Sequence, residues 1–552
     1  MAGIGYESAS MAEMDDNPRL PPFRSDVTGR AVWGRLAAYV AFVAMLLVVC
    51  VQYHQLMGRT LGRAEEADGA YHTALAAYRA DPDDPAKRAK VLRTMTAVRV
   101  VERTKGAIPR WSGAVRQFWA GENIYKPLRG AGIGDPLTGE LLPGQTPPSP
   151  PELTPGPTIE HITRRPDQMH PNMPFVVILL TPFAYLPLQV CVAAVNSLKI
   201  LALVASIFAA ASAANNRRHR MDEWVVGLAV LMAVPLILSD FQHGNTNLFV
   251  LAAIAVHLWL YRRGHDLAAG AALAMAVCLK MTPALFGLYW LYQRNGKLLA
   301  GLIVTLGVAA IAVPILAVGP ARYGELTGSW LDNLILPALL KGRPFPQHIN
   351  QSLPGVFWRL MMHGNIYYNP DDAPVAGKFD YINFLSLSPA AGRWVLTVLK
   401  AGVVAVMAWA IGWKKLPRDD ARRGLHYGLI VAGMLILNQR TWDHHAVTLL
   451  IAYVGIWYAL AYARIGRGVR VLCLAMTCAA GVITFLMGKS LFTALFGTDR
   501  GKEVADVVEA YGPMLLHFLL ISAVCVILLR ALAAADRRED TLFSPTRVPL
   551  RG

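Results

Sequence analysis

The sequence has little charge for its length. Only 16% of its 552 residues are Asp, Glu, Lys or Arg, while 54% are hydrophobic, whereas soluble domains carry about 25% charged residues. This deficit disfavours a string of soluble domains, which the length alone suggests. The hydrophobic residues form blocks of about 15–25, the length that crosses a bilayer core about 30 Å thick. With a mean hydropathy of +0.37, the sequence predicts an all-α, polytopic integral membrane protein embedded in the lipid bilayer.

CxxC cysteine pairs are also missing, and the sequence predicts no cleavable leader peptide. The six cysteines lie in or beside apolar blocks and form no CxxC pair, so the sequence indicates neither a disulfide framework nor a zinc site. We therefore expect no metal ion. A polar segment of about thirty residues precedes the first apolar block, with no small-residue cleavage site closely following it, so we expect no cleavable signal.

The basic excess is arranged in short clusters. The net charge is +16, from 53 basic and 37 acidic residues, and a basic chain can bind nucleic acid. Here the clusters stand at the ends of apolar blocks, where short Lys- and Arg-rich loops mark the cytoplasmic side. The charge therefore indicates topology, and we expect no nucleic-acid partner. The clusters lie within 24–35, 217–220, 262–263, 294–297, 414–423, 464–470 and 530–538.

About twelve membrane-spanning helices account for the apolar blocks. The predicted spans are 32–57, 188–213, 224–238, 248–261, 267–280, 283–292, 298–318, 394–413, 425–437, 446–463, 469–487 and 515–534. The two short spans around Lys280 are alternatively one broken hairpin. The stretch Met173–Leu186 is about fourteen residues long and is flanked by prolines, so we predict an interfacial or re-entrant helix there.

These spans divide the chain into seven parts, with both termini cytoplasmic and the protein in the plasma membrane. They are a cytoplasmic tail (1–31), a first transmembrane helix (32–57), an extracytoplasmic loop with amphipathic helices, a Pro-rich link and the interfacial helix (58–187), the first half of a transmembrane bundle (188–318), a second extracytoplasmic loop (319–392), the second half of the bundle (393–534) and a cytoplasmic tail (535–552). In the first loop, Leu61–Ala80 and Ala86–Val101 predict a helical hairpin on the outer membrane surface.

Three lysines lie inside predicted spans: Lys199, Lys280 and Lys400. Ionisable residues at membrane depth are costly and usually functional. Each lysine either pairs within the bundle or reaches an interface, or else it offers a cationic site to an anion that enters from the lipid. Lys280 is the strongest candidate for an anion site, because the Thr282-Pro283 break beside it frees backbone groups.

The predicted turn SDFQHGNTN is unusually polar. Besides two hydroxyl side chains it contains five carboxylate, amide or imidazole side chains, Asp240, Gln242, His243, Asn245 and Asn247. A turn needs only a glycine and one asparagine. The excess favours a polar ligand such as a sugar.

A second polar segment, NQRTWDHH, follows the predicted span 425–437. In it Arg440 can hold a phosphate with its guanidinium fork, and Trp442 can stack on a sugar face. An aspartate beside histidines can move protons. A metal site from Asp443, His444 and His445 is disfavoured, because adjacent ligands on a helix point about 100° apart.

Two patches lie on the predicted outer loops. The segment IPRWSGAVRQFWAGENIYKP, with Arg110 and Trp111, predicts an amphipathic helix that either anchors at the membrane interface or contributes to a site. The segment QHINQSLPGVFWRL places Asn350, Gln351 and Ser352 before a helix that starts with proline, and a helix N-terminus offers donors to an anion.

Several of these segments together resemble glycosyltransferase family 87. They are FWAGENIY, HPNMPFVVILLTPFAYLP, HGNTNLFVL, LAAGAALAMAVCLKMTPALFGLYWLYQR, INQSLPGV and TWDHH, in family order from about Lys105 to Arg464. The resemblance implies the integral-membrane C-type glycosyltransferase fold. It also implies a hexosyltransferase, in particular a mannosyltransferase, that works on the extracytoplasmic face. Its co-substrate is a polyprenyl-phosphate sugar, its acceptor is a glycan or glycolipid, and no cofactor takes part.

The chain departs from the family at one position. The family pattern has an aspartate, the expected general base, a few residues before GENIY. Here that position falls in KGAIPRW and carries no acid. The nearest acid is Glu102, while Glu122 lies downstream and Asp240 lies on another loop. The base has therefore moved, or this branch has altered chemistry or is inactive.

The predicted roles follow from charge and side of the membrane. The catalytic acid or base is sought among Glu102, Asp240 and Asp443. The donor phosphate is assigned to Lys280 and Arg440, supported by Lys199 and Arg110. The residues expected to contact sugar or acceptor are Trp111, His243, Asn245, Asn247, Asn350, Gln351, Trp442, His444 and His445. A transporter or flippase and a non-catalytic family member are the alternative functions.

Overall fold

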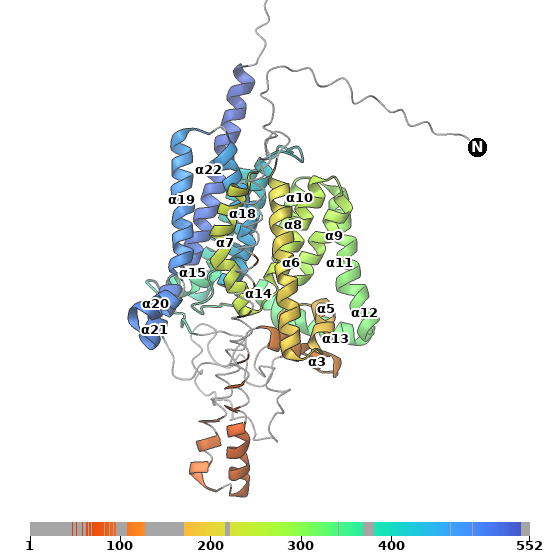
Figure 1. The fold of residues 1–552 in the computed structure, drawn as a ribbon, viewed down its shortest axis with the longest axis vertical. Helices are drawn as coiled ribbons and strands as arrows, with labels where there is room; N and C mark the ends of the chain where they lie inside the picture. The colour runs from red at the N-terminus through yellow and green to blue at the C-terminus, as the bar shows by residue number, and fades with distance from the viewer. Residues whose placement is uncertain are drawn as a thin grey trace, which may run out of the picture. The chain divides into compact units, whose positions relative to one another are not determined.

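A computed structural model describes residues 107–126, 170–215, 221–339, 342–367, 380–463, 465–487 and 489–542, together with scattered positions between 43 and 94. Every regular element in these residues is a helix (Figure 1). The all-α prediction is therefore confirmed for the part of the chain that the structure describes.

Seven stretches of helix are long and apolar enough to cross a membrane. They are α6 (Leu188–Ala214), α7 (Glu223–His243), α11 continued through η1 (Gly307–Ala312) and α12 (Gly296–Val318 as a whole), α16 (Pro389–Ile411), η3 with α18 (Asp443–Tyr462), α19 (Arg467–Leu486) and the apolar part of α22 (Pro513–Leu542). Each matches one predicted span. The protein is a multi-pass membrane protein.

Four further predicted spans are helices too, but shorter ones. They are α8 (Asn247–Arg262), α9 (Asp266–Leu279), α10 (Ala284–Tyr292) and α17 (Arg422–Leu437). At 1.5 Å per residue, α9 extends roughly 21 Å, which is less than a bilayer core. The first predicted span, 32–57, lies almost entirely outside the described residues, so the total of twelve stays a prediction.

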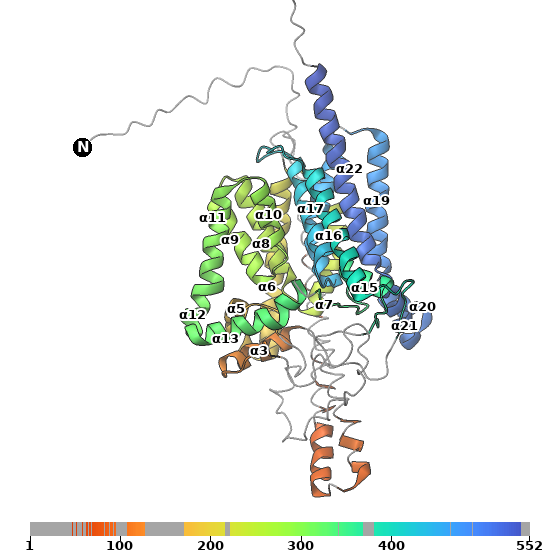
Figure 2. The same cartoon turned by 180° about the vertical axis from the view of Figure 1, so that it is seen from behind.

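The short helices end inside the bundle. Helix α9 packs along α11, but α11 to α12 continues for 23 residues whereas α9 stops after 14. The end of α9 is therefore recessed by roughly 14 Å from the end of α12. Figure 2 shows α12 and α6 extending past the ends of α8 and α9.

Two glycines allow α9 and α11 to touch through their backbones. A Cβ at Gly270 would lie 2.1 Å from the Leu298 carbonyl oxygen, and one at Gly301 would lie 2.2 Å from that of Leu267. Small residues at such contacts let membrane helices approach closely. This close packing sets the depth at which the end of α9 lies in the bundle.

The opposite end of the short helices is held by arginines. Arg418 donates from both terminal nitrogens to the Asp266 carboxylate, with an Nη2–Oδ2 distance of 2.8 Å. Arg423 donates to the Tyr289 hydroxyl at 3.0 Å. These contacts tie the loop before α17 to the start of α9, and the first turn of α17 to α10.

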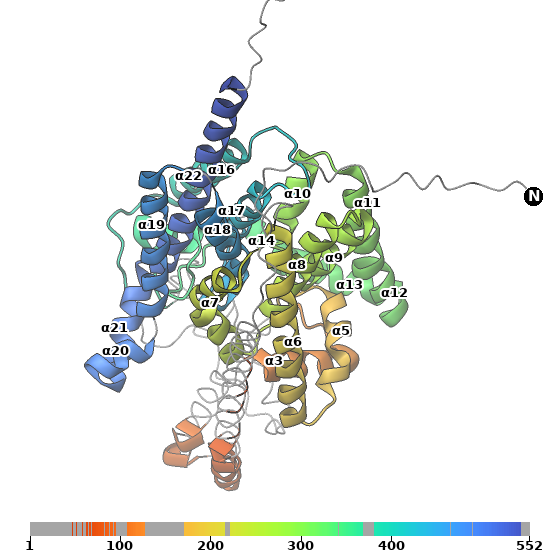
Figure 3. The same ribbon diagram turned by 45° about the horizontal axis from the view of Figure 1, so that its top comes forward.

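A separate helical layer lies beside the recessed ends. Helix α3 (Ala107–Trp119) packs on α5 (Pro174–Ala184) and α13 (Pro320–Trp330) through one apolar cluster (Figure 3). Trp111, Val115 and Phe118 are buried in it, which confirms the predicted amphipathic helix. Helix α5 has only 11 residues and passes through Pro182 before it ends, so it is too short to span a bilayer.

The predicted loops contain further helices. The second loop includes η2 (Leu331–Ile335), α14 (Leu336–Leu339) and α15 (Leu353–Met361), and α20 (Lys489–Phe496) and α21 (Thr498–Ala510) precede α22. In the first loop, Tyr71, Ala74, Leu75 and Val91 form a small core between two helical segments. The described part of the predicted hairpin is therefore helical; its place on a membrane surface stays a prediction.

Candidate functional site

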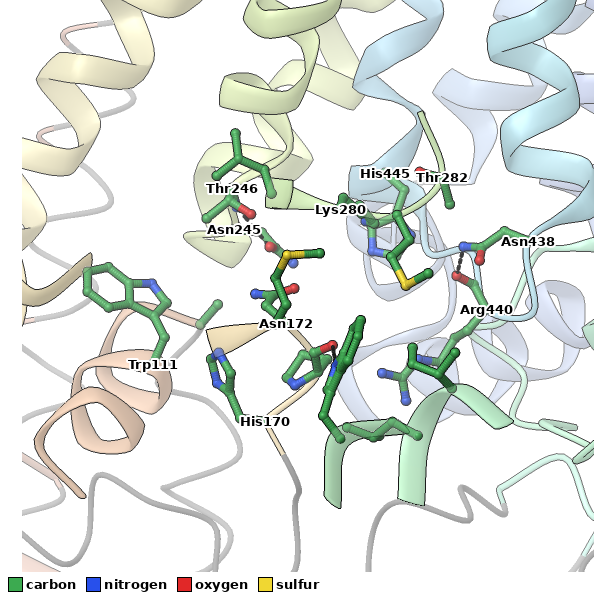
Figure 4. Close-up of a pocket in the computed structure, with 18 of the residues that line it drawn as sticks. Trp111, His170, Asn172, Asn245, Thr246, Lys280, Thr282, Asn438, Arg440 and His445 are labelled. Atoms are coloured by element: carbon green, nitrogen blue, oxygen red, sulfur yellow. Dashed lines mark hydrogen bonds between the residues drawn. The ribbon is translucent and has the colours of Figure 1, made fainter. Parts of the chain in front are cut away.

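A cavity of about 310 Å³ lies where the recessed helices end. Five segments line it: α3, residues 170–173 with α5, the turn before α8 together with the α9–α10 break, α13 to α14, and residues 438–445 (Figure 4). The cavity thus joins segments that are as much as 338 residues apart in the chain, from Ala107 to His445.

Three cationic side chains line the cavity: Arg110, Lys280 and Arg440. Among the described residues no aspartate or glutamate does so. A group of cations without a carboxylate favours an anionic ligand, and their attraction for it is stronger away from bulk water. The electrostatics therefore select an anion.

Lys280 reaches the cavity because α9 stops directly before it. Its backbone is extended (φ −160°, ψ 130°), and its amide donates to the Ala276 carbonyl to close the helix. Pro283 begins the next turn, where a proline is favoured at a helix start and cannot continue a helix before it. The Nζ of Lys280 donates to Asn247 Oδ1 at 2.7 Å. An ammonium has three donors, so two remain for a ligand.

Behind Lys280 lies a buried polar chain. Asn247 Nδ2 donates to Asp240 Oδ1 at 2.9 Å, and Lys199 Nζ lies 2.8 Å from Asp240 Oδ2. The side chains of Lys199 and Asp240 are completely buried, and neither residue lines the cavity. The structure places this ion pair between α6 and α7, where each charge compensates the other, rather than on a phosphate or a reacting hydroxyl.

Arg440 is presented by a tightly held turn. Asn350 Oδ1 accepts from the Thr441 amide at 3.0 Å, and Asn350 Nδ2 donates to the Gln439 carbonyl at 3.1 Å. The guanidinium lies 5.1 Å from the ring centre of Trp442 and 5.5 Å from that of Phe345. Cation–π contacts of this kind fix the direction of an arginine without using its hydrogen-bond donors.

Asn350 and Gln351 support the site from behind. Gln351 Nε2 donates to the carbonyls of His348 and Glu509, both at 2.8 Å. Both side chains are buried and neither residue lines the cavity. In the structure the two side chains therefore support the Gln439–Thr441 turn. The sequence had predicted that they contact the sugar. Ser352 caps α15 through the Gly355 amide.

The predicted sugar-contacting residues divide into two groups. Trp111, Asn245, Trp442 and His445 line the cavity. Asn245 Nδ2 donates to His444 Nε2 at 2.9 Å, and His444 stacks on His243 at 4.3 Å. His243 and His444 are thus one layer further out, behind Asn245, and Asn247 is behind Lys280.

Of the predicted acids, Asp240 is in the buried ion pair, and Asp443 begins η3 without lining the cavity. Glu102 lies outside the described residues.

His170 also lines the cavity, although the sequence did not predict it as a site residue, and it is only 7% exposed. Its amide donates to the Ile124 carbonyl at 3.1 Å, which ties it to the turn after α3. Its sequence signal is its place at the start of the family segment HPNMPFVVILLTPFAYLP.

Three ring nitrogens at the cavity have no hydrogen-bond partner among the described residues: Trp111 Nε1, His170 Nε2 and Trp442 Nε1. Buried polar atoms of this kind usually find a partner, so a ligand is the natural one here. Burial and the nearby charge of Arg110 lower the pKa of His170 to about 4. The imidazole is therefore neutral at pH 7 and is able to accept a proton.

The remaining lining is a mixture of amide, hydroxyl and apolar side chains. The polar ones to which the sequence assigned no role are Asn172, Thr246, Thr282, Asn438 and Gln439; the last two belong to the predicted polar segment NQRTWDHH. The apolar ones include Met173, Leu180, Leu279, Met281, Leu334, Ile335 and Ala338. A ligand with a charged or polar end and an apolar chain fits this division.

The long apolar helices and the recessed cavity define a multi-pass helical membrane protein with a polar, cationic site. The family model of glycosyltransferase family 87 matches residues 172–438, and this match supports the family that the motifs predict. The family indicates a glycosyltransferase that acts on sugar substrates in a membrane. No curated protein and no solved structure matches the chain.

Proposed function

We propose that the protein transfers a hexose, in particular mannose, from a polyprenyl-phosphate donor to a glycan or glycolipid acceptor. The observation that carries this proposal is the cavity: three cations, no carboxylate among the described lining residues, three tryptophans and an apolar wall. These features correspond in turn to the phosphate, the sugar and the polyprenyl chain of one donor molecule.

The donor phosphate is assigned to Lys280, Arg440 and Arg110. At 4 Å, unit charges attract by about 1 kcal/mol in water but by about 4 kcal/mol at an effective dielectric of 20. A recessed cavity therefore strengthens these contacts. The cations also stabilise the charge that grows on the phosphate as it leaves, which is where a fixed charge accelerates a reaction most.

The sugar and the lipid chain occupy different parts of the cavity in this proposal. Trp111 and Trp442 line the cavity, and their unpartnered Nε1 atoms offer donors to sugar hydroxyls. The apolar chain lies along α5 and the η2–α14 segment, where Leu180, Leu334 and Ile335 line the cavity.

For the transfer step we propose His170 as the base. An acceptor hydroxyl attacks the anomeric carbon opposite the phosphate, and the new glycosidic C–O bond forms as the sugar–phosphate C–O bond breaks. The hydroxyl proton goes to His170 Nε2, the bond electrons leave with the phosphate, and the configuration inverts. Glu102 stays the alternative base, because the structure does not describe it.

The side of the membrane follows from the basic clusters. The cavity lies at the Asn245 end of α8 and the Leu279 end of α9, whereas the basic residues lie at their Arg262 and Asp266 ends. Since Lys- and Arg-rich loops stay cytoplasmic, we propose that the cavity opens to the extracytoplasmic face of the plasma membrane.

The test is a transfer assay with the purified full-length protein, a labelled polyprenyl-phosphate mannose and candidate acceptors. We expect Lys280→Met to lower kcat by roughly 10²–10³-fold, as the loss of one charge-stabilising group does. Lys400→Met is the matched control, because Lys400 lies half-buried on α16 away from the cavity.

Full activity of Lys280→Met removes Lys280 from the proposed mechanism. Movement of the donor across a vesicle membrane without transfer identifies a flippase instead, and neither activity identifies a non-catalytic protein.

A further inference from the structure

A group of metal-binding side chains lies away from the cavity, between the second loop and α21. His348 comes from the segment before α15, while Asp506 and Glu509 come from α21. The two acids are three residues apart, so they lie on the same face of the helix. Their carboxylates converge on an imidazole that is 158 residues away from Asp506 in the chain.

The distances suit one small cation. His348 Nδ1 lies 3.0 Å from Glu509 Oε2 and 3.8 Å from Asp506 Oδ1, and the three ligand atoms lie within 4.8 Å of one another. Around a tetrahedral zinc ion with bonds of about 2.0–2.2 Å, ligand atoms are about 3.3–3.6 Å apart. The two distances from His348 Nδ1 lie on both sides of this range, so binding a cation needs only small movements of the imidazole relative to each carboxylate.

The surroundings are rigid enough to hold a metal. The side chains of His348 and Glu509 are 10% and 6% exposed, and that of Asp506 is 18% exposed. Arg359 Nε donates to the Ala510 carbonyl at 2.7 Å, and Gln351 Nε2 donates to the Glu509 carbonyl at 2.8 Å. These bonds hold the end of α21 against the loop together with the three side chains.

We propose that His348, Asp506 and Glu509 bind one zinc ion, with water in the fourth position. One imidazole nitrogen with two carboxylate oxygens is a donor set that zinc accepts, whereas calcium and magnesium prefer oxygen ligands alone. The two carboxylates neutralise the charge of the ion. The sequence predicts no metal because it has no CxxC pair, and the three ligands come from segments that are 158 residues apart.

The zinc ion has a structural role for the cavity. It joins α21 to the segment that carries Asn350, and Asn350 holds the Gln439–Thr441 turn through the bonds described above. Loss of the metal therefore loosens the support of Arg440 without removing any residue that lines the cavity. Zinc binding itself does not depend on the proposed transferase activity.

The experiment measures zinc in the full-length protein after treatment with a chelator and dialysis. The protein is titrated with zinc against a competing chromophoric chelator. We expect one zinc per chain in the wild type and in Glu503→Gln, a control that removes an exposed acid from the same helix. In His348→Ala, Asp506→Asn and Glu509→Gln we expect affinity to fall by more than the roughly 10–100-fold that loss of an outer hydrogen bond costs.

X-ray absorption at the zinc edge should show nitrogen and oxygen ligands and no sulfur. A wild-type protein that binds no stoichiometric zinc overturns the proposal, and so does unchanged zinc affinity in Asp506→Asn. Thermal unfolding of each variant is measured alongside, and the partly exposed Asp506→Asn serves as the deciding variant if His348→Ala does not fold. Zinc binding with no transfer activity supports this inference and counts against the proposed function, so the two failures are distinguishable.

Discussion

Charged residues inside the apolar blocks fall into two kinds that look alike in the sequence. Lys199 is fully buried against Asp240, while Lys280 faces the cavity and has one bond to Asn247. Removing one partner of a buried pair costs about 3–5 kcal/mol because it leaves the other charge uncompensated. Position relative to the cavity, and not the presence of a charge, decides which lysine is available to a ligand.

The pH dependence of transfer tests His170. Its lowered pKa of about 4 means that the folded protein keeps the imidazole neutral as the pH falls, whereas the unfolded chain protonates it near 6.5. At pH 5.5 roughly 97% of the side chain is then in the basic form, against roughly 9% for an ordinary histidine. We expect kcat to stay constant between pH 7 and pH 5.5, and His170→Gln to lower kcat by about 10²–10⁴-fold with little change in KM.

The same shift has a consequence for stability. Because the unfolded chain binds the proton first, the contribution of neutral His170 to folding is fully present above pH 6.5 and is lost as the pH falls towards 4.

The pH profile of kcat can also contradict the assignment of His170 as the base. If kcat falls below about pH 6.5 and still does so in His170→Gln, another group controls the rate.

Much of the cavity could be predicted from residue types alone. Seven predicted site residues line it, namely Arg110, Trp111, Asn245, Lys280, Arg440, Trp442 and His445. They were recognisable because charged, aromatic and amide side chains beside apolar blocks are costly unless they have a partner. His170 escaped prediction because one histidine in a polar loop has no such cost, and its burial depends on α3 and α13.

At the scale of the helices, length decides the depth of the site. A crossing needs about 20 residues, but α8, α9 and α10 have 16, 14 and 9. The prolines and polar turns that end them are visible in the sequence. Their depth in the membrane depends on how they pack against the longer helices beside them.

The contact between α9 and α11 carries a prediction. In Gly270→Ala the new Cβ would lie 2.1 Å from the Leu298 carbonyl oxygen and 2.6 Å from the Leu302 amide nitrogen. Because both are backbone atoms, the helices must move apart, and we expect a loss of about 1–3 kcal/mol of stability. Unfolding of the purified protein in detergent, followed by tryptophan fluorescence, measures this.

Gly402→Ala on α16 is the matched control. No atom lies within 4 Å of its added Cβ, so only helix propensity changes, which favours alanine by up to about 1 kcal/mol. Equal stabilities of the two variants contradict the close packing of α9 on α11. A loss of transfer activity in Gly270→Ala alone shows that this packing also positions Lys280.

At the scale of the molecule, the orientation in the membrane carries a prediction. Glu325 on α13 lies on the cavity side and is half exposed, with a relative accessibility of 52%, and Lys415 lies exposed in the basic loop before α17. In a cysteine-free background, we expect Glu325→Cys to react with a membrane-impermeant maleimide in intact cells. Lys415→Cys should react only after the membrane is permeabilised.

Labelling of Lys415→Cys in intact cells, with Glu325→Cys protected, reverses the orientation and places the cavity on the cytoplasmic side. The seven long apolar helices do not decide this, because hydrophobic length is the same in both directions. The orientation is decided by the difference in Lys and Arg content between the loops at the two ends of these helices.

The sequence by itself determined that the chain is helical and crosses a membrane, since low charge and long apolar blocks leave no other stable arrangement of the backbone in lipid. Its motifs also predicted the family that matches residues 172–438. The tertiary structure alone decided which polar residues face the cavity, that Lys199 neutralises Asp240, and that His348 meets α21. The physical reason is that apolar spacing follows from local chain geometry, whereas a hydrogen bond or an ion pair between distant segments exists only once the helices between them have packed.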